Sequence, residues 1–148
     1  MIDVVEFLDL DDVVELAAAL LGDPPPVRDL GLLGSAIARP RTTLFGQDAY
    51  PDMWTKAAAL LQSIVNNHAL IDGNKRLGWL AAAVFLEING IEISHADNND
   101  VYELVLNIAT NNPPIEQIAT GLKQLIDTNQ RPDRPIPGPD RAHHHPGT

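Results

Sequence analysis

A short polar segment, residues 68–76 with the sequence HALIDGNKR, interrupts an apolar part of the chain. Residues 51–66 before it place Ala, Leu, Ile and Val at helical spacing, and residues 77–88 after it are apolar almost all round. This order indicates a helix, a short loop, and a second helix whose first turn lies at the end of the polar segment. We predict that this second helix is the central, buried helix of the fold.

The rest of the chain is also mainly helical in character. We predict further helices at about residues 9–21, 27–38, 100–110 and 115–126. Residues 41–50 combine β-branched and aromatic residues with Gly46, which fits either a small hairpin or an irregular loop. Pro51 suits the first position of the helix that leads to the polar segment. The predicted fold class is therefore all-α: a compact helical bundle with a possible small β-hairpin.

The domain organisation follows from length and composition. The 148 residues are enough for one domain with a real core, and we predict that it spans residues 1–127. Prolines alternate with charged residues after Asp127, so residues 128–148 are predicted to be a disordered tail. Its three histidines, residues 143–145, have no scaffold to fix their geometry, so no metal site is expected there. His95, beside a turn, is expected to be a surface or cap residue.

Composition excludes several classes of protein. The chain has no cysteine, which rules out disulfides and thiolate metal sites and is compatible with a reducing cytoplasm. A net charge of −10 argues against a general nucleic-acid binder, because phosphate backbones require clustered cations. No signal peptide is visible, and the apolar run at residues 77–86 is too short to span a bilayer. We therefore expect a soluble cytoplasmic protein that binds neither nucleic acid nor membrane.

The end of the polar segment has the properties of an anion site. The first backbone N–H groups of a helix lack partners, and the helix dipole places partial positive charge there. Gly73 allows a sharp turn and the close approach of a ligand, and Asn74 can cap the helix or bind a phosphate oxygen. Lys75 and Arg76 place full positive charges where the dipole disfavours them, so an anionic partner is expected.

Two further residues of the segment suit catalysis on phosphates. Asp72 offers oxygen ligands for Mg²⁺ held between one carboxylate and substrate phosphates. His68 can accept a proton near neutral pH. The residues together indicate a phosphoryl- or nucleotidyl-transfer site. The alternative is a polar turn that only caps a helix. The imidazole, the carboxylate, the glycine, the amide and the two cations all occur within nine residues between two apolar helices, which argues against this alternative.

The segment resembles the signature of the Fic/Doc family, whose loop runs His-x-Phe-x-Asp/Glu-Gly/Ala-Asn-Gly/Lys-Arg. Leu70 stands where Phe is usual, which is a mild change at an apolar anchor. Ala69 stands where Fic loops usually have Pro, and Lys75 where they usually have Gly, so the segment is closer to the Doc (death-on-curing) toxins. The length and helical layout of residues 2–126 also suit a Doc-like domain.

The resemblance implies a role for each residue of the segment. His68 is implied to be the general base that takes the proton from a Ser or Thr hydroxyl of a protein target. Asp72 is implied to hold Mg²⁺, and Gly73 with Asn74 to line the phosphate cradle. Lys75 and Arg76 are implied to neutralise the nucleotide phosphates and the charge that develops in the transition state. In this family a hairpin "flap" lies near the loop and positions the target.

The resemblance also implies a reaction. Lys75 would partly fill the room that Gly leaves for a phosphate in AMP-transferring Fic enzymes, so a Doc-like protein kinase is expected. It would transfer the ATP γ-phosphate to translation elongation factor Tu and so block translation. Gly73, shared with Fic loops, leaves AMP transfer open as a second reading.

A third reading is a catalytically weak module that binds an antitoxin. Family toxins are neutralised by a partner antitoxin whose disordered segment folds onto the toxin. The sequence has no obvious inhibitory Ser/Thr-x-x-x-Glu helix, so restraint of this chain is expected to come from a separate antitoxin.

Overall fold

The computed structural model describes residues 4–93 and 95–129. This part of the chain forms six α-helices, a short 3₁₀ helix and a two-stranded antiparallel sheet. The helices are α1 (Leu10–Leu21), α2 (Leu30–Ala38), α3 (Met53–Asn67), α4 (Asn74–Ile88), α5 (Asn98–Asn111) and α6 (Ile115–Asn129). Between α2 and α3 lie η1 (Arg39–Arg41), β1 (Thr43–Leu44) and β2 (Gln47–Asp48). The predicted all-α class is confirmed, and the possible hairpin is present.

Aspartate side chains determine where four of these helices begin. Asp9, Asp29, Asp52 and Asp97 are the N-cap residues of α1, α2, α3 and α5, and each accepts a hydrogen bond from a backbone N–H of the first turn. Two predicted helix starts are therefore wrong. Helix α2 begins after Asp29 rather than at residue 27, and Pro51 precedes the Asp52 cap instead of opening α3.

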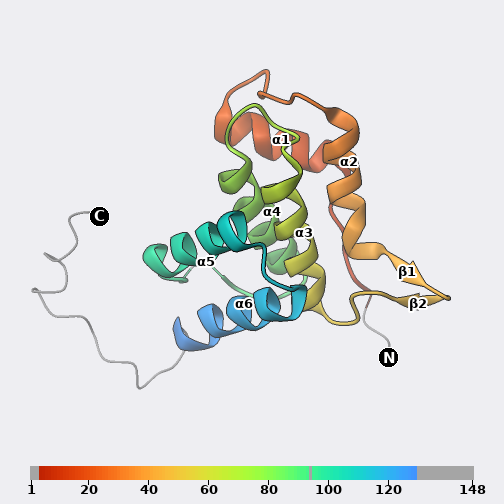
Figure 1. The fold of residues 1–148 in the computed structure, drawn as a ribbon, viewed down its shortest axis with the longest axis vertical. Helices are drawn as coiled ribbons and strands as arrows, with labels where there is room; N and C mark the ends of the chain where they lie inside the picture. Colours follow the sequence, from red (N-terminus) through yellow and green to blue (C-terminus); the bar gives the residue numbers. More distant parts are fainter. Residues whose placement is uncertain (1–3, 94, 130–148) are drawn as a thin grey trace, which may run out of the picture.

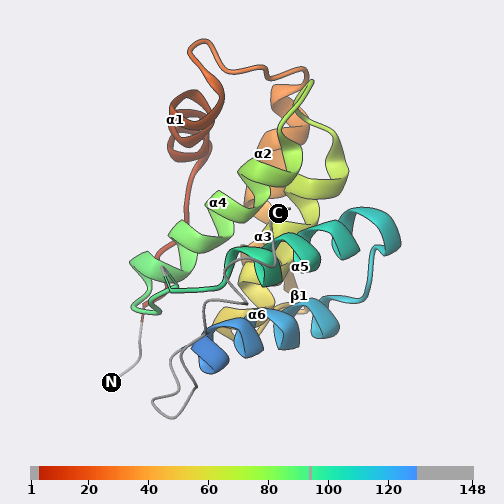
Figure 2. The same cartoon turned by 90° about the vertical axis from the view of Figure 1, so that its left-hand side faces the viewer.

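Helices α3 and α4 form the centre of the molecule. α1 and α2 pack on one side of this pair, and α5 and α6 on the other (Figures 1 and 2). The apolar residues predicted to face inward from α3, including Leu60, Leu61 and Ile64, are at most 1% exposed. α4 buries Leu77 and Phe85 but leaves Ile88 exposed, so α3 shares the central position predicted for α4. The polar loop thus joins the two helices that form most of the core.

Gly78 sets how closely these two helices approach. A Cβ atom there would lie 2.8 Å from Cγ2 of Val65, which is closer than carbon atoms normally come. The absence of a side chain therefore lets α4 pack directly against α3 just after the loop.

The hairpin lies at the other end of α3 from the polar loop. β1 pairs with β2 through Thr43–Asp48 and Leu44–Gln47, and the Nζ atom of buried Lys56, near the start of α3, lies 3.2 Å from Oδ2 of Asp48. The loop follows the C-terminal end of α3, and the helix is about 22 Å long. Figure 1 shows the hairpin and the loop at opposite ends of the helix. The expectation that the hairpin lies near the loop is not met.

Helix α6 continues to Asn129, two residues past the predicted end of the domain. The rest of the predicted tail, with the histidines at residues 143–145, lies outside the described residues. His95 is exposed, as predicted, and its Nε2 atom lies 3.4 Å from Oε2 of Glu92. Among the described residues, no helix is both long and apolar enough to cross a membrane.

Candidate active site

His68 marks the end of α3 and the start of the polar loop. It is the C-cap residue, with φ 57° and ψ 37°, the left-handed conformation that L-residues rarely adopt. Its imidazole is exposed and makes no hydrogen bond to any described residue, so it is free to accept a proton from a substrate.

Residues 26–29, the last part of the connector between α1 and α2, run beside the loop. The N–H groups of Arg28 and Asp29 donate to the carbonyl of Ala69 at 2.8 and 3.0 Å. The N–H of Ile71 donates to the carbonyl of Pro26 at 2.9 Å, and Val27 and Leu70 form an antiparallel bridge. The loop is therefore held by backbone pairing as well as by its own helices. The apolar spacing predicts a helix from residue 27, so it did not predict this contact. The prolines just before residue 27 favour an extended chain and could have indicated it.

Asp72 and Gly73 form the turn into α4. Asp72 is exposed, and its Oδ1 atom accepts a hydrogen bond from the N–H of Gly73 at 2.9 Å. Gly73 has φ 90°, and a Cβ atom there would lie 2.7 Å from both Cδ atoms of Leu21. The backbone conformation therefore favours glycine at this position, and a Cβ atom there would also force the side chain of Leu21 to shift.

The donor set fits Mg²⁺ bound together with a nucleotide. No cluster of three or more His, Cys, Asp or Glu side chains is found within the described ranges. A single exposed carboxylate such as Asp72 suits Mg²⁺, which keeps several water ligands and takes others from substrate phosphates. A metal held by protein ligands alone does not fit this arrangement.

Asn74 does not cap α4 but is its first residue. Its Oδ1 atom accepts from the N–H of Leu70 at 3.0 Å, and its Nδ2 atom donates to the carbonyl of Leu70 at 3.1 Å. The amide predicted to bind phosphate is thus occupied in closing the loop. No side chain caps the first turn of α4, in contrast to the aspartate-capped helices, so the start of α4 retains unsatisfied N–H groups that an anion can use.

Lys75 and Arg76 are exposed, and neither forms an ion pair with the described part of the chain. Both lie at the edge of a groove of about 460 Å³ between α4 and α5. The rest of its lining is mostly apolar: Trp79, Asn98, Val101, Tyr102, Val105 and Leu106. Two cations beside an apolar, aromatic surface match a ligand with an anionic end and a flat apolar end. The sequence analysis did not predict that α5 contributes to this groove. Tyr102, an aromatic residue on a polar helix face, could have indicated it.

The comparisons with known proteins agree with this geometry. The Fic/DOC family model matches residues 7–86, which include the whole loop. Toxin Doc of Mycolicibacterium smegmatis (strain ATCC 700084 / mc(2)155) is 48% identical over 118 residues, which are 79% of this chain and 91% of that protein. The chain belongs to the Fic/DOC family. The resemblance inferred from residues 68–76, including its Doc-like character, is confirmed.

Membership of the Fic/DOC family indicates a transferase-type enzyme with a nucleotide substrate. The structure also explains how this member accommodates its departure from the usual loop. Leu70 is 2% exposed and packs in the core, so leucine serves as the apolar anchor where Phe is usual.

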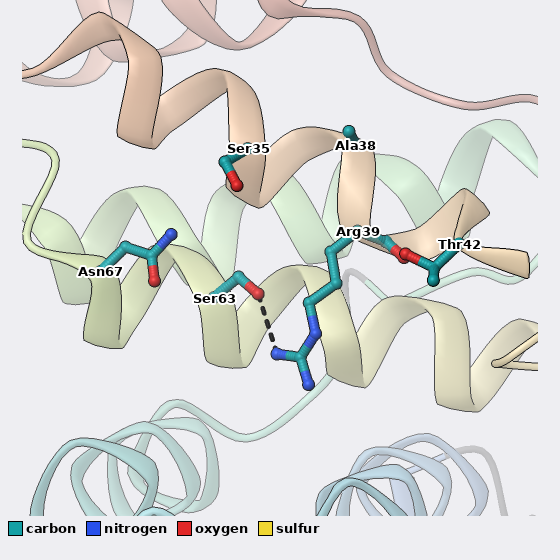
Figure 3. Close-up of a pocket in the computed structure, with 6 residues that line it drawn as sticks. All are labelled: Ser35, Ala38, Arg39, Thr42, Ser63 and Asn67. Atoms are coloured by element: carbon teal, nitrogen blue, oxygen red, sulfur yellow. Dashed lines mark hydrogen bonds between the residues drawn. The ribbon is translucent and has the colours of Figure 1, made fainter. Parts of the chain in front are cut away.

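A second hollow of the Fic/DOC domain lies between α2–η1 and α3, with a volume of about 480 Å³. Figure 3 shows Arg39 crossing from η1 to α3, where its Nη1 atom donates to Oγ of Ser63 at 2.9 Å. Nη1 also donates to Gln62, and Nε to the hydroxyl of Tyr50. Arg39 therefore ties η1 to α3, and no residue of the polar loop lines this hollow.

Proposed function

We propose that this protein is a Doc-like protein kinase that transfers the γ-phosphate of ATP to a Ser or Thr hydroxyl of a protein target. The observation that carries the proposal is the polar loop itself. It presents an exposed imidazole, an exposed carboxylate and two exposed cations around the uncapped start of α4, and neither cation forms an ion pair with a described residue. We propose elongation factor Tu as the target, because the resemblance to Doc toxins implies it; phosphorylation would then block translation.

In this proposal His68 is the general base. The hydroxyl oxygen of the target bonds to the γ-phosphorus while the hydroxyl proton passes to the imidazole. The bond from the γ-phosphorus to the β–γ bridging oxygen breaks, and ADP leaves with the electron pair. Because the imidazole is exposed and makes no hydrogen bond to a described residue, a target segment can reach it without breaking a contact within that part of the chain.

The residues after His68 hold the nucleotide. Asp72 would hold Mg²⁺ against the phosphates, where the ion offsets their charge. Gly73 and the first N–H groups of α4 form the cradle, and Lys75 and Arg76 stabilise the phosphates and the charge of the transition state. Asn74 contributes by shaping this cradle through Leu70 rather than by binding phosphate.

The groove between α4 and α5 is the proposed site of the nucleoside. Trp79 and Tyr102 offer aromatic surface for a base, and Lys75 and Arg76 at the groove's edge lie where the phosphates would follow. A base in this groove and phosphates at the start of α4 would place one ATP molecule along the N-terminal half of α4.

AMP transfer is the second candidate, because Gly73 is shared with Fic loops. Lys75 argues against it, since its side chain would partly fill the space that the nucleotide phosphate needs in AMP-transferring Fic enzymes. A module without catalysis is less well supported, because all three proposed catalytic residues, His68, Asp72 and Arg76, are present and exposed. The similarity to Toxin Doc supports a further proposal, that a separate antitoxin with a disordered neutralising segment restrains this protein.

The test is the intact mass of translation factors after incubation with the protein, ATP and Mg²⁺. A gain of about 80 Da, one phosphoryl group, is expected on elongation factor Tu. The gain should disappear with His68→Ala and persist with the control His95→Ala, which removes another exposed imidazole, one outside the loop. A gain of one AMP group would establish Fic-type chemistry instead, and no gain on any factor would contradict the proposed target.

A further inference from the structure

The last part of the connector between α1 and α2, residues 26–29, does more than join two helices. Its main chain pairs with residues 69–71 through three hydrogen bonds of 2.8–3.0 Å. Beyond this backbone pairing, one side chain of the connector also reaches the loop: the Nη2 atom of Arg28 donates to the backbone carbonyl of His68.

Arg28 gives the carbonyl of His68 a partner that α3 does not supply. The last carbonyls of a helix have no N–H to accept from within the helix, and a left-handed C-cap turns the following peptide away from the helix axis. Glycine usually occupies that conformation, whereas here it is a histidine with φ 57°. Arg28 therefore holds the peptide that joins His68 to Ala69 in an orientation that histidine does not favour.

We propose that Arg28 is a positioning residue for His68. It fixes the peptide on the C-terminal side of His68 and so fixes the direction in which the imidazole projects toward a substrate. This inference rests on the proposed role of His68 as general base. The guanidinium donates to the main chain of His68 and not to its imidazole, so Arg28 would act through His68 rather than on the reacting atoms.

Folding and positioning are separable at this residue. The three main-chain hydrogen bonds and the packing of Leu70, which is 2% exposed, do not depend on the side chain of Arg28. Arg28 is itself exposed, so its truncation opens no cavity in the core. Loss of the side chain should therefore leave the loop folded and change only the orientation of His68.

The test compares Arg28→Met, Arg28→Lys and the control Arg41→Met. Methionine keeps an unbranched chain without a donor, and lysine keeps a donor. Arg41 also donates from Nη2 to a backbone carbonyl, that of Leu8 at 3.4 Å, but lies outside the loop and its connector. We expect Arg28→Met to lower kcat by about tenfold to a hundredfold, with the KM for ATP changed less than about twofold. Arg28→Lys should recover most of the loss, and Arg41→Met should leave kcat unchanged.

A readout that needs no substrate separates this proposal from the proposed function. The chemical shifts of the His68 imidazole, followed by NMR, should change in Arg28→Met and not in Arg41→Met. If the His68 resonances change in this way but the wild-type protein transfers no phosphate, the kinase proposal is contradicted and the positioning role is supported. Unchanged His68 resonances would overturn the positioning role. A raised KM for ATP with kcat unchanged would also overturn it, because Arg28 would then be a phosphate contact.

Discussion

The side chain of Asn74 forms two hydrogen bonds with the main chain of Leu70, accepting from its N–H at 3.0 Å and donating to its carbonyl at 3.1 Å. The two residues are four apart, so these bonds close the turn that contains Ile71, Asp72 and Gly73. An amide carries its acceptor and its donor on two separate atoms, so it can make both bonds at once. The shape of the proposed phosphate cradle therefore depends on an asparagine that need not touch the phosphate.

Replacing Asn74 by aspartate is expected to open this turn. The carboxylate can still accept from the N–H of Leu70, but it cannot donate, and it would place negative charge against the Leu70 carbonyl. We expect a loss of about 1–3 kcal/mol in the free energy of unfolding, measured by urea denaturation, together with loss of nucleotide binding. Asn99→Asp, at an exposed position of α5, is the control and should change stability by less than about 0.5 kcal/mol. Equal effects of the two substitutions would show that the Leu70 contacts are unimportant.

The parts of this site that the sequence predicts are those encoded locally. The loop between α3 and α4, its glycine and its adjacent cations lie within residues 68–76, and the flanking helices follow from apolar spacing. The contacts that hold the site come from far away in the sequence: Arg28 meets His68 across 40 residues, and Tyr102 reaches the groove from α5. Such pairings depend on how the helices pack, which helical periodicity does not specify. The place of the hairpin, by contrast, follows from chain order, because it comes just before α3 and the loop comes just after it. The expectation that the hairpin lies near the loop came from the family resemblance.

Gly73→Ala should destabilise the protein by more than its backbone conformation alone explains. Gly73 and Gly90 both have φ 90°, but a Cβ at Gly90 meets nothing within 4 Å, whereas one at Gly73 would lie 2.7 Å from Leu21. We expect about 1–2 kcal/mol of lost stability for Gly90→Ala from the strained φ, and about 1–3 kcal/mol more for Gly73→Ala from overpacking. Thermal or urea unfolding of the two variants measures the difference.

A second substitution tests the contact itself. Leu21→Ala removes the atoms that the new Cβ would meet, so the double variant Gly73→Ala with Leu21→Ala should lose less stability than the sum of the single variants. Strict additivity would contradict the overpacking explanation and leave only the φ requirement.

Tyr102→Ala is expected to weaken nucleotide binding without affecting the fold. Tyr102 is 62% exposed and lines the groove beside Lys75 and Arg76, so its ring is available for a base to stack on. Loss of stacking should weaken the binding of an ATP analogue by about 1 kcal/mol or more, or at least about fivefold, by calorimetry. Tyr102→Phe keeps the ring and should bind nearly as well as the wild type, and Glu103→Ala, exposed on the same helix but outside the groove, should have no effect. If Tyr102→Ala binds normally, the base lies elsewhere.

The choice between phosphoryl and AMP transfer is expected to depend on the volume of the Lys75 side chain. Lys75 is exposed at the start of α4, where it forms no ion pair with the described residues, so its replacement disrupts no partner. Lys75→Gly would open room in the cradle, and we expect part of the product on the protein target to carry AMP instead of phosphate, measured by intact mass.

Lys75→Met separates volume from charge, because methionine keeps most of the size and loses the cation. If volume decides the reaction, Lys75→Met should still transfer only phosphate, more slowly because one charge at the phosphates is missing. If charge decides, Lys75→Met should yield AMP product as Lys75→Gly does. Unchanged phosphate transfer by both variants would mean that Lys75 does not select the reaction, and the choice would then lie with the groove that orients the base.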